Sequence, residues 1–336
     1  MGDEPIAIAL KRESAAVVHA AMTEHPRRRT LLRSIRDYAI VVCFGALFLA
    51  LTFASDVFLT STNLLNLLEQ NAPVGIIALA LTFVLITGEF DLSVGAIAML
   101  TGVLAAYWVA PLGVWPALLV AALCACGLGA INGVLVAYAK INSFVCTLAT
   151  SLIIAGASLA ITKGFIKTVP DPAFSDLGLG EFLGIKYSIW LFVAAALVAA
   201  LVLGRSVFGR WLYAVGGNAE AARLSGINVG GVRVAAFALS GLAGGIAGAI
   251  IASRTGQGQA GDGLSITLFA FAAVVIGGTS TLGGRGSVWR TVLGVLLLAL
   301  IVNGFNLIGI DPIYQQIVQG GIVLLAVATD SLSRRR

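Results

Sequence analysis

Charged residues are scarce in this chain of 336 residues: only 11% are Asp, Glu, Lys or Arg, whereas 59% are apolar. A soluble domain of this length needs far more polar surface to cover its core. Histidine is almost absent as well, and both copies, His19 and His25, lie in the polar N-terminal segment. These shortages argue against a soluble enzyme and against a histidine-based metal centre or proton relay.

Metal-site and nucleotide-binding motifs are also lacking. The four cysteines lie inside apolar runs, and Cys124 and Cys126 have no second Cys or His pair at zinc-site spacing. No G-x-x-x-x-G-K-[ST] string occurs, so the glycines of "IGGTSTLGGRGSVWR" (276–290) are predicted to form a tight turn between helices rather than a phosphate loop. We therefore expect no cofactor, no metal and no catalytic residue in this chain.

Long apolar runs, in contrast, are abundant. A helix needs about 20 apolar residues to cross a bilayer, and ten runs qualify, which predicts an all-α polytopic membrane protein. The forty glycines suit close packing of helices in a bilayer. Because Pro73 and Gly75 lie near the start of the second run, we expect a short helix there followed by a broken one. The predicted spans are 38–58, 68–88, 93–110, 114–138, 144–162, 188–206, 232–253, 265–283, 287–308 and 313–329.

The positive charges predict the orientation of these spans. The polar segment 1–37 lacks the features of a secretory signal, and its arginines are expected to hold the N-terminus in the cytoplasm. Ten spans within a transmembrane domain 38–330 return the basic C-terminus, 331–336, to the same side. The longest external loop is then 163–187 and the longest internal loop is 207–231. All but four of the 21 lysines and arginines fall inside, and the exceptions are Lys163, Lys167, Lys186 and Arg254.

The internal loop contains a compact helical stretch, "NAEAARLSG". Asn218 can cap a helix there and Gly226 can end it. A permease driven by an external ATPase needs a small rigid element of this kind, on which Glu220 and Arg223 would offer charge to the partner. An ordinary amphipathic connector is the alternative.

Two acidic residues stand in the apolar stretch "VLITGEFDLSVGAIAML" (84–100). A charge at membrane depth is energetically costly unless it has an ion-pair partner, contacts water or serves a function. Asp91 and Ser93 are placed to cap the helix that starts near Ser93, and a gate at the cytoplasmic mouth is the alternative role for Asp91. We expect Glu89 to lie in water at that mouth or to pair with an arginine such as Arg285.

A weak internal repeat links the two halves of the chain. "DLSVGAIAML" at 91 is similar to "DGLSITLFAF" at 262, and Asn132-Gly133 lies at about the same offset as Asn303-Gly304. The copies fall in spans five apart, so they would be inverted in the membrane, as in many transporters. Chance similarity between apolar runs is the alternative.

Uncharged polar residues inside the spans suit a pathway for a neutral polyhydroxylated solute. Hydrogen bonding between helices is the alternative for each of them. The candidate pathway residues are Asn71, Asn132, Thr150, Asn303, Asn306 and Gln315.

Three motifs, "GEFDLSVG" (88–95), "YAVGGNAEAARLSGINV" (213–229) and "AAVVIGGTSTLGGRGSVWRTVLG" (272–294), resemble the permease subunits of ribose/xylose/galactose-type ABC importers, over about residues 38–329. The resemblance implies a ten-helix permease in a bacterial cell (inner) membrane that imports a monosaccharide or related polyol as a homodimer. It also implies a cytoplasmic ATP-binding subunit and a periplasmic or extracellular sugar-binding protein. Glu89 departs from the glycine common in the family. The residues that would contact the ATPase are Gly217, Asn218, Glu220, Ala221, Arg223, Leu224, Ser225 and Gly226.

An ion-coupled secondary carrier is the main rival interpretation. Such carriers place ionisable groups deep in the helix bundle, whereas Glu69, Glu89 and Asp91 lie at predicted span ends. A passive channel or scaffold is a further rival, and it has no use for the compact cytoplasmic helix.

Overall fold

The structure is a computed structural model that describes residues 26–261, 263–311, 313–315, 317–318, 320–321 and 324, with side chains described from Ile40 onward. Residues 1–25, most of the predicted span 313–329, and the C-terminal segment 331–336 lie outside the described residues. The chain divides into two units, Met1–Val42 and Cys43–Arg336. The second unit carries all the features described below.

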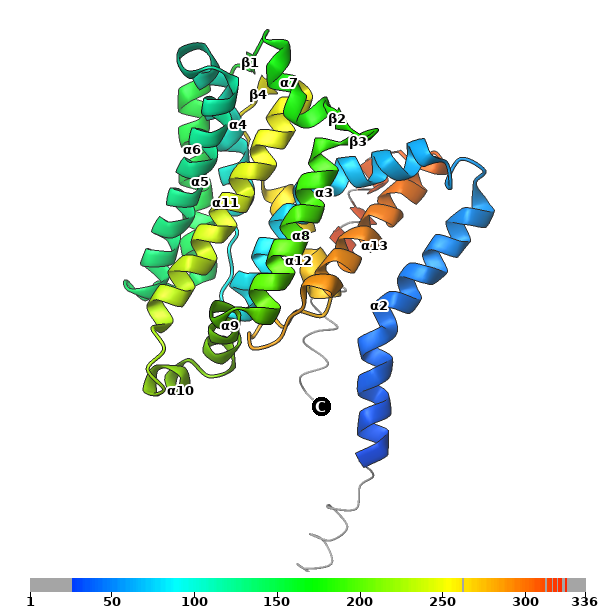
Figure 1. The fold of residues 1–336 in the computed structure, drawn as a ribbon, viewed down its shortest axis with the longest axis vertical. Coiled ribbons are helices and arrows are strands. Elements are labelled where there is room, and N and C mark those ends of the chain that lie inside the picture. Colours follow the sequence, from blue (N-terminus) through cyan, green and yellow to red (C-terminus); the bar gives the residue numbers. More distant parts are fainter. Residues whose placement is uncertain are drawn as a thin grey trace, which may run out of the picture. The chain divides into compact units, whose positions relative to one another are not determined.

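The described chain is mainly helical (Figure 1). Seven helices of this described part are long and apolar enough to cross a membrane on length and composition. They are α3 (Ser61–Ile86), α4 (Val94–Leu112), α5 (Val114–Ala137), α6 (Ser143–Thr162), α8 (Tyr187–Arg205), α11 (Val229–Thr255) and α13 (Val288–Leu307). The remaining helices are α2 (Pro26–Ala54), α7 (Pro172–Leu179), α9 (Val207–Gly217), α10 (Ala219–Leu224) and α12 (Leu264–Ile276).

Two of the predicted spans differ clearly from the helices that form. Helix α3 is not broken: it begins after the Thr60 cap and continues through Pro73 to Ile86. A proline removes only one N–H from the helix, and the neighbouring helices that bury this half of α3 hold it in place. Helix α12 ends at Ile276 rather than near 283, because Gly277 and Gly278 turn the chain and Gly278 has φ +85°.

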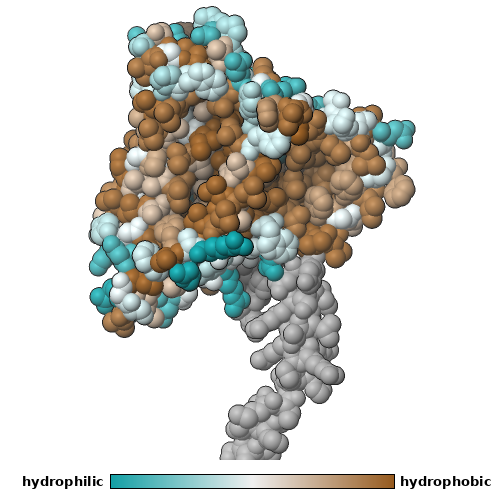
Figure 2. All heavy atoms as spheres, viewed as in Figure 1, coloured by the Kyte–Doolittle hydropathy of each residue, from teal (hydrophilic) through white to brown (hydrophobic). Residues whose placement is uncertain are grey.

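The second unit has two polar ends (Figures 1 and 2). At one end lie α7 and two antiparallel strand pairs, β1 (Lys167–Thr168) with β4 (Gln257–Gly258) and β2 (Glu181–Phe182) with β3 (Ile185–Lys186). The predicted external loop 163–187 is therefore partly structured. At the other end lie α9, α10 and the turn between α12 and α13. Apolar residues cover the helix sides between the two ends in Figure 2, as expected for a surface that faces lipid.

The four basic residues predicted to lie outside gather at the α7 end. Lys163 follows α6, Lys167 is in β1 and Lys186 is in β3. Arg254, at the end of α11, packs its backbone against Gly178 of α7. The common location of these four residues agrees with the predicted separation of charge.

Glycines line the contact between α5 and α11. A Cβ added at Gly129 would lie 2.2 Å from the Phe237 carbonyl oxygen, and one added at Gly241 would lie 2.3 Å from that of Ala125. Only glycine permits such close approach of two helix backbones. The packing role predicted from the glycine content is confirmed at this contact.

The two segments of the weak repeat occupy corresponding places in the fold. Helix α4 starts at Val94 after the non-helical residues 87–93, and α12 starts at Leu264 after another non-helical stretch. The two helix starts touch, because the Gly95 N–H donates to Thr267 Oγ1 at 2.9 Å. Each copy thus begins a helix in the interior of the bundle.

Candidate functional site

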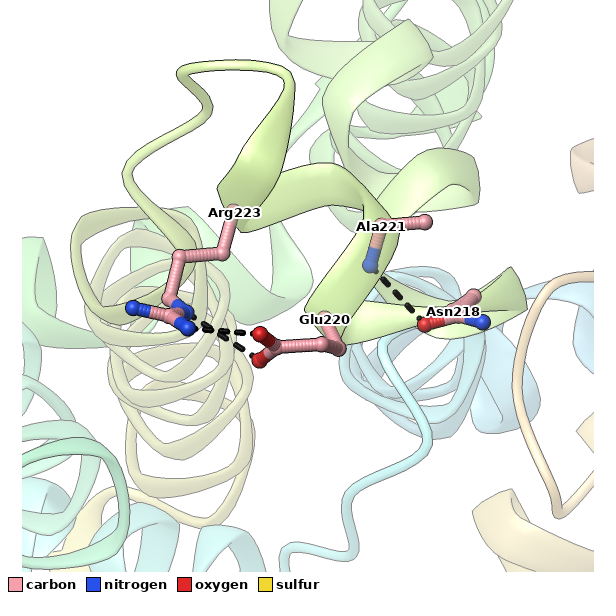
Figure 3. A network of polar contacts seen from close by, with 4 residues as sticks. All are labelled: Asn218, Glu220, Ala221 and Arg223. Carbon is pink, nitrogen blue, oxygen red and sulfur yellow. Dashed lines mark hydrogen bonds and ion pairs between the residues drawn. The ribbon is translucent and has the colours of Figure 1, made fainter.

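Residues 206–228 form two short helices at one end of the bundle, and we call them the α9–α10 platform. Ser206 caps α9 by accepting from the Gly209 N–H at 2.9 Å. Asn218 starts α10 by accepting from the Ala221 N–H at 3.0 Å (Figure 3). After α10 the chain turns at Gly226, whose φ is +83°. The predicted cap and stop of α10 are confirmed, whereas α9, with three glycines in eleven residues, was not predicted.

The exposed side of α10 carries an ion pair and a leucine. Arg223 donates to both Glu220 carboxylate oxygens, at 2.5 and 3.1 Å (Figure 3). These hydrogen bonds hold the pKa of Glu220 below its ordinary value, so the pair is complete at neutral pH and is lost only as the pH falls below that range. Leu224 is 77% exposed. A charged pair beside an exposed leucine is suited to contact another protein.

The platform is fixed to the ends of α3 and α13. Gly216 of α9 lies against the Ile86 carbonyl, which also accepts from the Gly284 N–H at 2.9 Å. The Tyr213 hydroxyl donates to the Gly286 carbonyl at 2.8 Å, and burial raises the pKa of this phenol, so it stays protonated. A displacement of the platform would therefore act directly on the C-terminal end of α3 and the N-terminal end of α13.

Glu89 pairs with an arginine, which confirms one of its two predicted environments, but the partner is Arg233 of α11, at 3.0 Å, and not Arg285. Glu89 is 13% exposed and Arg233 is 26% exposed, so the pair is largely shielded from water. Arg233 lies in the second turn of α11, shortly after the platform. The ion pair thus joins the first turns of α11 to the non-helical residues that follow α3.

This ion pair gives a testable coupling energy. Replacing Glu89→Gln or Arg233→Gln removes one charge and leaves the other half-buried, so each change should lower the free energy of unfolding by about 1–2 kcal/mol. The double variant should cost less than the sum of the two. Thermal unfolding of the wild-type protein, the two single variants and the double variant measures the coupling energy in a double-mutant cycle. Strictly additive losses would mean that the two side chains do not interact.

Asp91 lies just before the start of α4 and is the centre of a buried polar cluster. Its carboxylate accepts from the Ser93 N–H at 2.9 Å, the Ser93 hydroxyl at 2.6 Å and the Ser240 hydroxyl at 2.6 Å. Asn132 donates in turn to the Ser93 hydroxyl at 2.8 Å. Ser93 occupies the N-cap position of α4, but its side chain accepts from no free N–H of that helix. The predicted capping by Ser93 is therefore wrong, because its hydroxyl is engaged with Asp91.

A pocket of about 230 Å³ lies between the first half of α3 and the last turns of α13. Six of the ten residues around it carry amide side chains, and the lining residues include no charged side chain. Asn63 and Asn303 form reciprocal hydrogen bonds across it, at 3.2 and 2.8 Å. The full lining is Asn63, Asn66, Leu67, Gln70, Asn71, Ala299, Val302, Asn303, Asn306 and Leu307.

The predicted pathway residues are divided between this pocket and other places. Asn71, Asn303 and Asn306 line the pocket, and Gln315 donates to Asn306 at 2.8 Å. Asn132 belongs to the Asp91 cluster, whereas the Thr150 hydroxyl donates to the Thr147 carbonyl within α6. Neither of these two residues lines the pocket.

Sequence reasoning missed three amides of the pocket, Asn63, Asn66 and Gln70. Their spacing of three and four residues places them on one face of α3. That periodicity could have revealed them. Asn63 and Asn66 precede the predicted start of the second span at residue 68, whereas Gln70 lies inside that span.

Comparisons with known proteins agree with the resemblance seen in the motifs. The family model described as "branched-chain amino acid transport system / permease component" matches residues 63–327. The ribose import permease protein of Haemophilus influenzae is 39% identical over 82% of this chain and 86% of its own length. The L-arabinose ABC transporter permease protein of Azospirillum brasilense is 35% identical over 94% of both chains. The xylose transport system permease protein of Escherichia coli is 36% identical over 90% of this chain and 93% of its own. No solved structure matches the chain.

The matched region and the helices assign the chain to a class of membrane proteins. Among the described residues, six of the seven helices that are long and apolar enough to cross a membrane lie within 63–327, and the seventh, α3, lies within it except for its first two residues. The resemblance to sugar import permeases, noted from three motifs, is confirmed over most of the chain. This multi-pass protein of the bacterial inner membrane belongs to the family of transport-system permease components.

Proposed function

We propose that this chain is the membrane-spanning permease subunit of an ATP-driven importer that carries a monosaccharide or related polyol inward. The observation that carries the proposal is the α9–α10 platform, an exposed helix pair seated on the inner ends of α3 and α13. A separate cytoplasmic subunit would bind and hydrolyse ATP, and it would dock on Glu220, Arg223 and Leu224.

The proposed substrate class follows from the named relatives and from the chain's own polar groups. The family description names branched-chain amino acids, whereas the relatives are named for ribose, arabinose and xylose. An amino acid carries two charges, which are recognised most strongly by charged partners. The pocket between α3 and α13 is lined by amides, which favours a neutral sugar.

The proposed assembly contains two copies of this permease, the ATP-binding subunit and a sugar-binding protein at the outer face. Each permease would have ten spans, including residues 313–329, with both termini in the cytoplasm. The excess of basic residues at the α9–α10 end over the four at the α7 end supports this orientation. The basic residues at the α9–α10 end are Lys140, Arg205, Arg210, Arg223, Arg233, Arg285 and Arg290. The binding protein would then dock at the α7 end and the ATPase at the opposite end.

Transport in this proposal is alternating access without covalent chemistry. ATP binding moves the ATPase, and the platform transmits the displacement to α3, α13 and α11. The Glu89–Arg233 ion pair transmits the motion of α11 to residues 87–93, which would serve as part of the inner gate. The proposed gate therefore includes Glu89, Asp91 and Ser93.

An ion-coupled carrier is the second candidate because Asp91, which lies between the ends of α3 and α4 as predicted, is buried. However, three donors take three of the about four acceptor positions of its carboxylate. Its hydrogen bonds favour a structural role and thus the ATP-driven mechanism.

The platform can be tested with a matched pair of leucines. Leu224 on α10 is 77% exposed and Leu183, at the opposite end, is 78% exposed. Leu224→Asp places a charge in the proposed contact, which should weaken association with the ATPase about tenfold or more. Leu183→Asp should leave association unchanged. The measurement is co-purification with a co-expressed candidate ATP-binding subunit from the same organism, followed by an ATPase assay.

The outcomes of this experiment separate the candidates. Loss of ATPase association in Leu224→Asp alone, with unchanged thermal unfolding, supports docking on the platform. Equal association in both variants would refute the platform as the docking site. A wild-type chain that purifies alone and moves solute under an ion gradient would instead establish the secondary carrier.

A further inference from the structure

We propose that the amide-lined pocket between α3 and α13 is a contact site for a neutral polyhydroxylated solute at the outward end of the transport pathway. This inference rests on the proposed function and adds the place where the permease itself holds the sugar. The pocket lies between the N-terminal half of α3 and the C-terminal turns of α13. These helix ends are opposite to the ends that contact the platform.

The chemistry of the lining fits sugar hydroxyl groups. Each amide presents a carbonyl oxygen that accepts and an NH₂ group that donates, and a hydroxyl group needs both kinds of partner. Six amides converge here from two helices, without a charged residue among the lining side chains. Leu67 and Ala299 are buried and provide an apolar floor for the C–H groups of a sugar ring. The solute is therefore neutral and polyhydroxylated rather than ionic.

The hydrogen bonds inside the pocket separate fixed amides from available ones. Asn63 and Asn303 hold each other, Asn71 donates to the Leu67 carbonyl at 2.8 Å, and Asn306 accepts from Gln315. Among the described residues, Asn66 and Gln70 have no side-chain hydrogen-bond partner, and both are exposed. A rigid frame with two available amides meets the requirement that a site be organised before its ligand arrives.

The size of the pocket limits the solute to a small molecule. Pockets for drug-sized ligands have volumes of about 300–1,000 Å³, and this one has about 230 Å³. A single small solute matches that space better than a chain of sugars does.

The walls of the pocket are the helices that reach the platform. Thr82 of α3 and Thr291 of α13 share a buried hydrogen bond of 2.8 Å near the opposite ends of the same two helices. Beyond it, Ile86 and Gly286 contact the platform through Gly216 and Tyr213. A shift of α3 relative to α13 would change the pocket and the platform contacts together. The pocket is thus placed to release its solute when the ATPase acts.

The test compares amide residues inside the pocket with an amide residue outside it, in the complete importer. Gln70→Leu and Asn66→Leu remove hydrogen-bonding groups from the pocket and keep a side chain of similar size. Gln259→Leu is the matched control, because Gln259 is also exposed and follows β4 at the same end of the bundle. Proteoliposomes containing the permease, the ATP-binding subunit and the sugar-loaded binding protein report sugar moved per ATP hydrolysed.

We expect Gln70→Leu and Asn66→Leu each to lower the sugar moved per ATP about fivefold. The concentration of binding protein that gives half-maximal ATPase activity should stay unchanged in both variants. In Gln259→Leu, both this concentration and the sugar moved per ATP should equal the wild-type values. Alanine variants at positions 66 and 70 repeat the test if a leucine variant does not purify as a stable protein, since both side chains are exposed.

Two results would overturn the inference. Pocket variants that move as much sugar per ATP as Gln259→Leu would show that the pocket does not touch the solute. A raised half-maximal concentration of binding protein, at unchanged sugar per ATP, would make these residues part of the docking surface instead. If the wild-type complex moves no sugar at all, the proposed function fails, which is a different outcome from either of these.

Discussion

Replacing Asp91 with alanine is expected to lower the free energy of unfolding by about 3 kcal/mol or more. The change leaves the Ser93 N–H, the Ser93 hydroxyl and the Ser240 hydroxyl without their acceptor in a buried place. Asp91→Asn should cost much less, because one oxygen remains for Ser93 and the Ser240 hydroxyl can turn to accept from the new NH₂ group. Thermal unfolding in detergent is the measurement.

Asp56→Ala provides the matched control for this prediction. Asp56 is exposed in the segment between α2 and α3, so its replacement should change the free energy of unfolding by less than about 0.5 kcal/mol. Ser240→Ala removes a single donor and should cost about 1 kcal/mol. An Asp91→Ala protein as stable as the Asp56→Ala protein would show that the cluster contributes nothing to the fold.

Replacing Gly216 with alanine should have an effect of similar size through packing alone. The added Cβ would lie 1.7 Å from the Ile86 carbonyl oxygen and 2.5 Å from the Gly284 nitrogen, so the platform must move away from α3. That movement also breaks the hydrogen bond between Gly284 and Ile86. We expect a loss of about 2–3 kcal/mol or more in the free energy of unfolding, measured by thermal unfolding.

The neighbouring glycine is the control for this substitution. A Cβ at Gly217 would meet no atom within 4 Å, so Gly217→Ala should leave stability equal or raise it by up to about 1 kcal/mol, because alanine favours the helix. Two adjacent glycines in the last turn of α9 should thus give opposite results. Similar unfolding temperatures for both variants would contradict the close approach of Gly216 to Ile86.

The sequence was most informative where one local property decides the structure. Apolar runs located the helices, and the spacing of Asn218 and Gly226 located α10, because caps and stops act within a few residues. The partners of Glu89 and Asp91 were not predictable in this way. Arg233 and Ser240 are more than 140 positions away along the chain, and only the folded bundle brings them together. The amide pocket needed the same long-range information, since α13 supplies one of its walls.

The length of α12 shows a different limit of the sequence. The run 265–283 is apolar enough to suggest a full span, yet the helix has 13 residues because Gly277 and Gly278 turn the chain after Ile276. Hydropathy measures how well a residue tolerates an apolar environment, and protein interior and lipid are alike in that respect. A short helix buried among other helices therefore resembles one that spans the bilayer.

The glycine contact between α5 and α11 has a consequence for leakage of ions. Backbone atoms of the two helices approach so closely at Gly129, Gly241 and Gly245 that not even a methyl group fits between them. A file of water molecules, along which protons or ions could cross, needs more room than that. The contact between α5 and α11 consequently leaves no path for water or ions between these two helices, so it opposes leakage that would discharge the membrane potential.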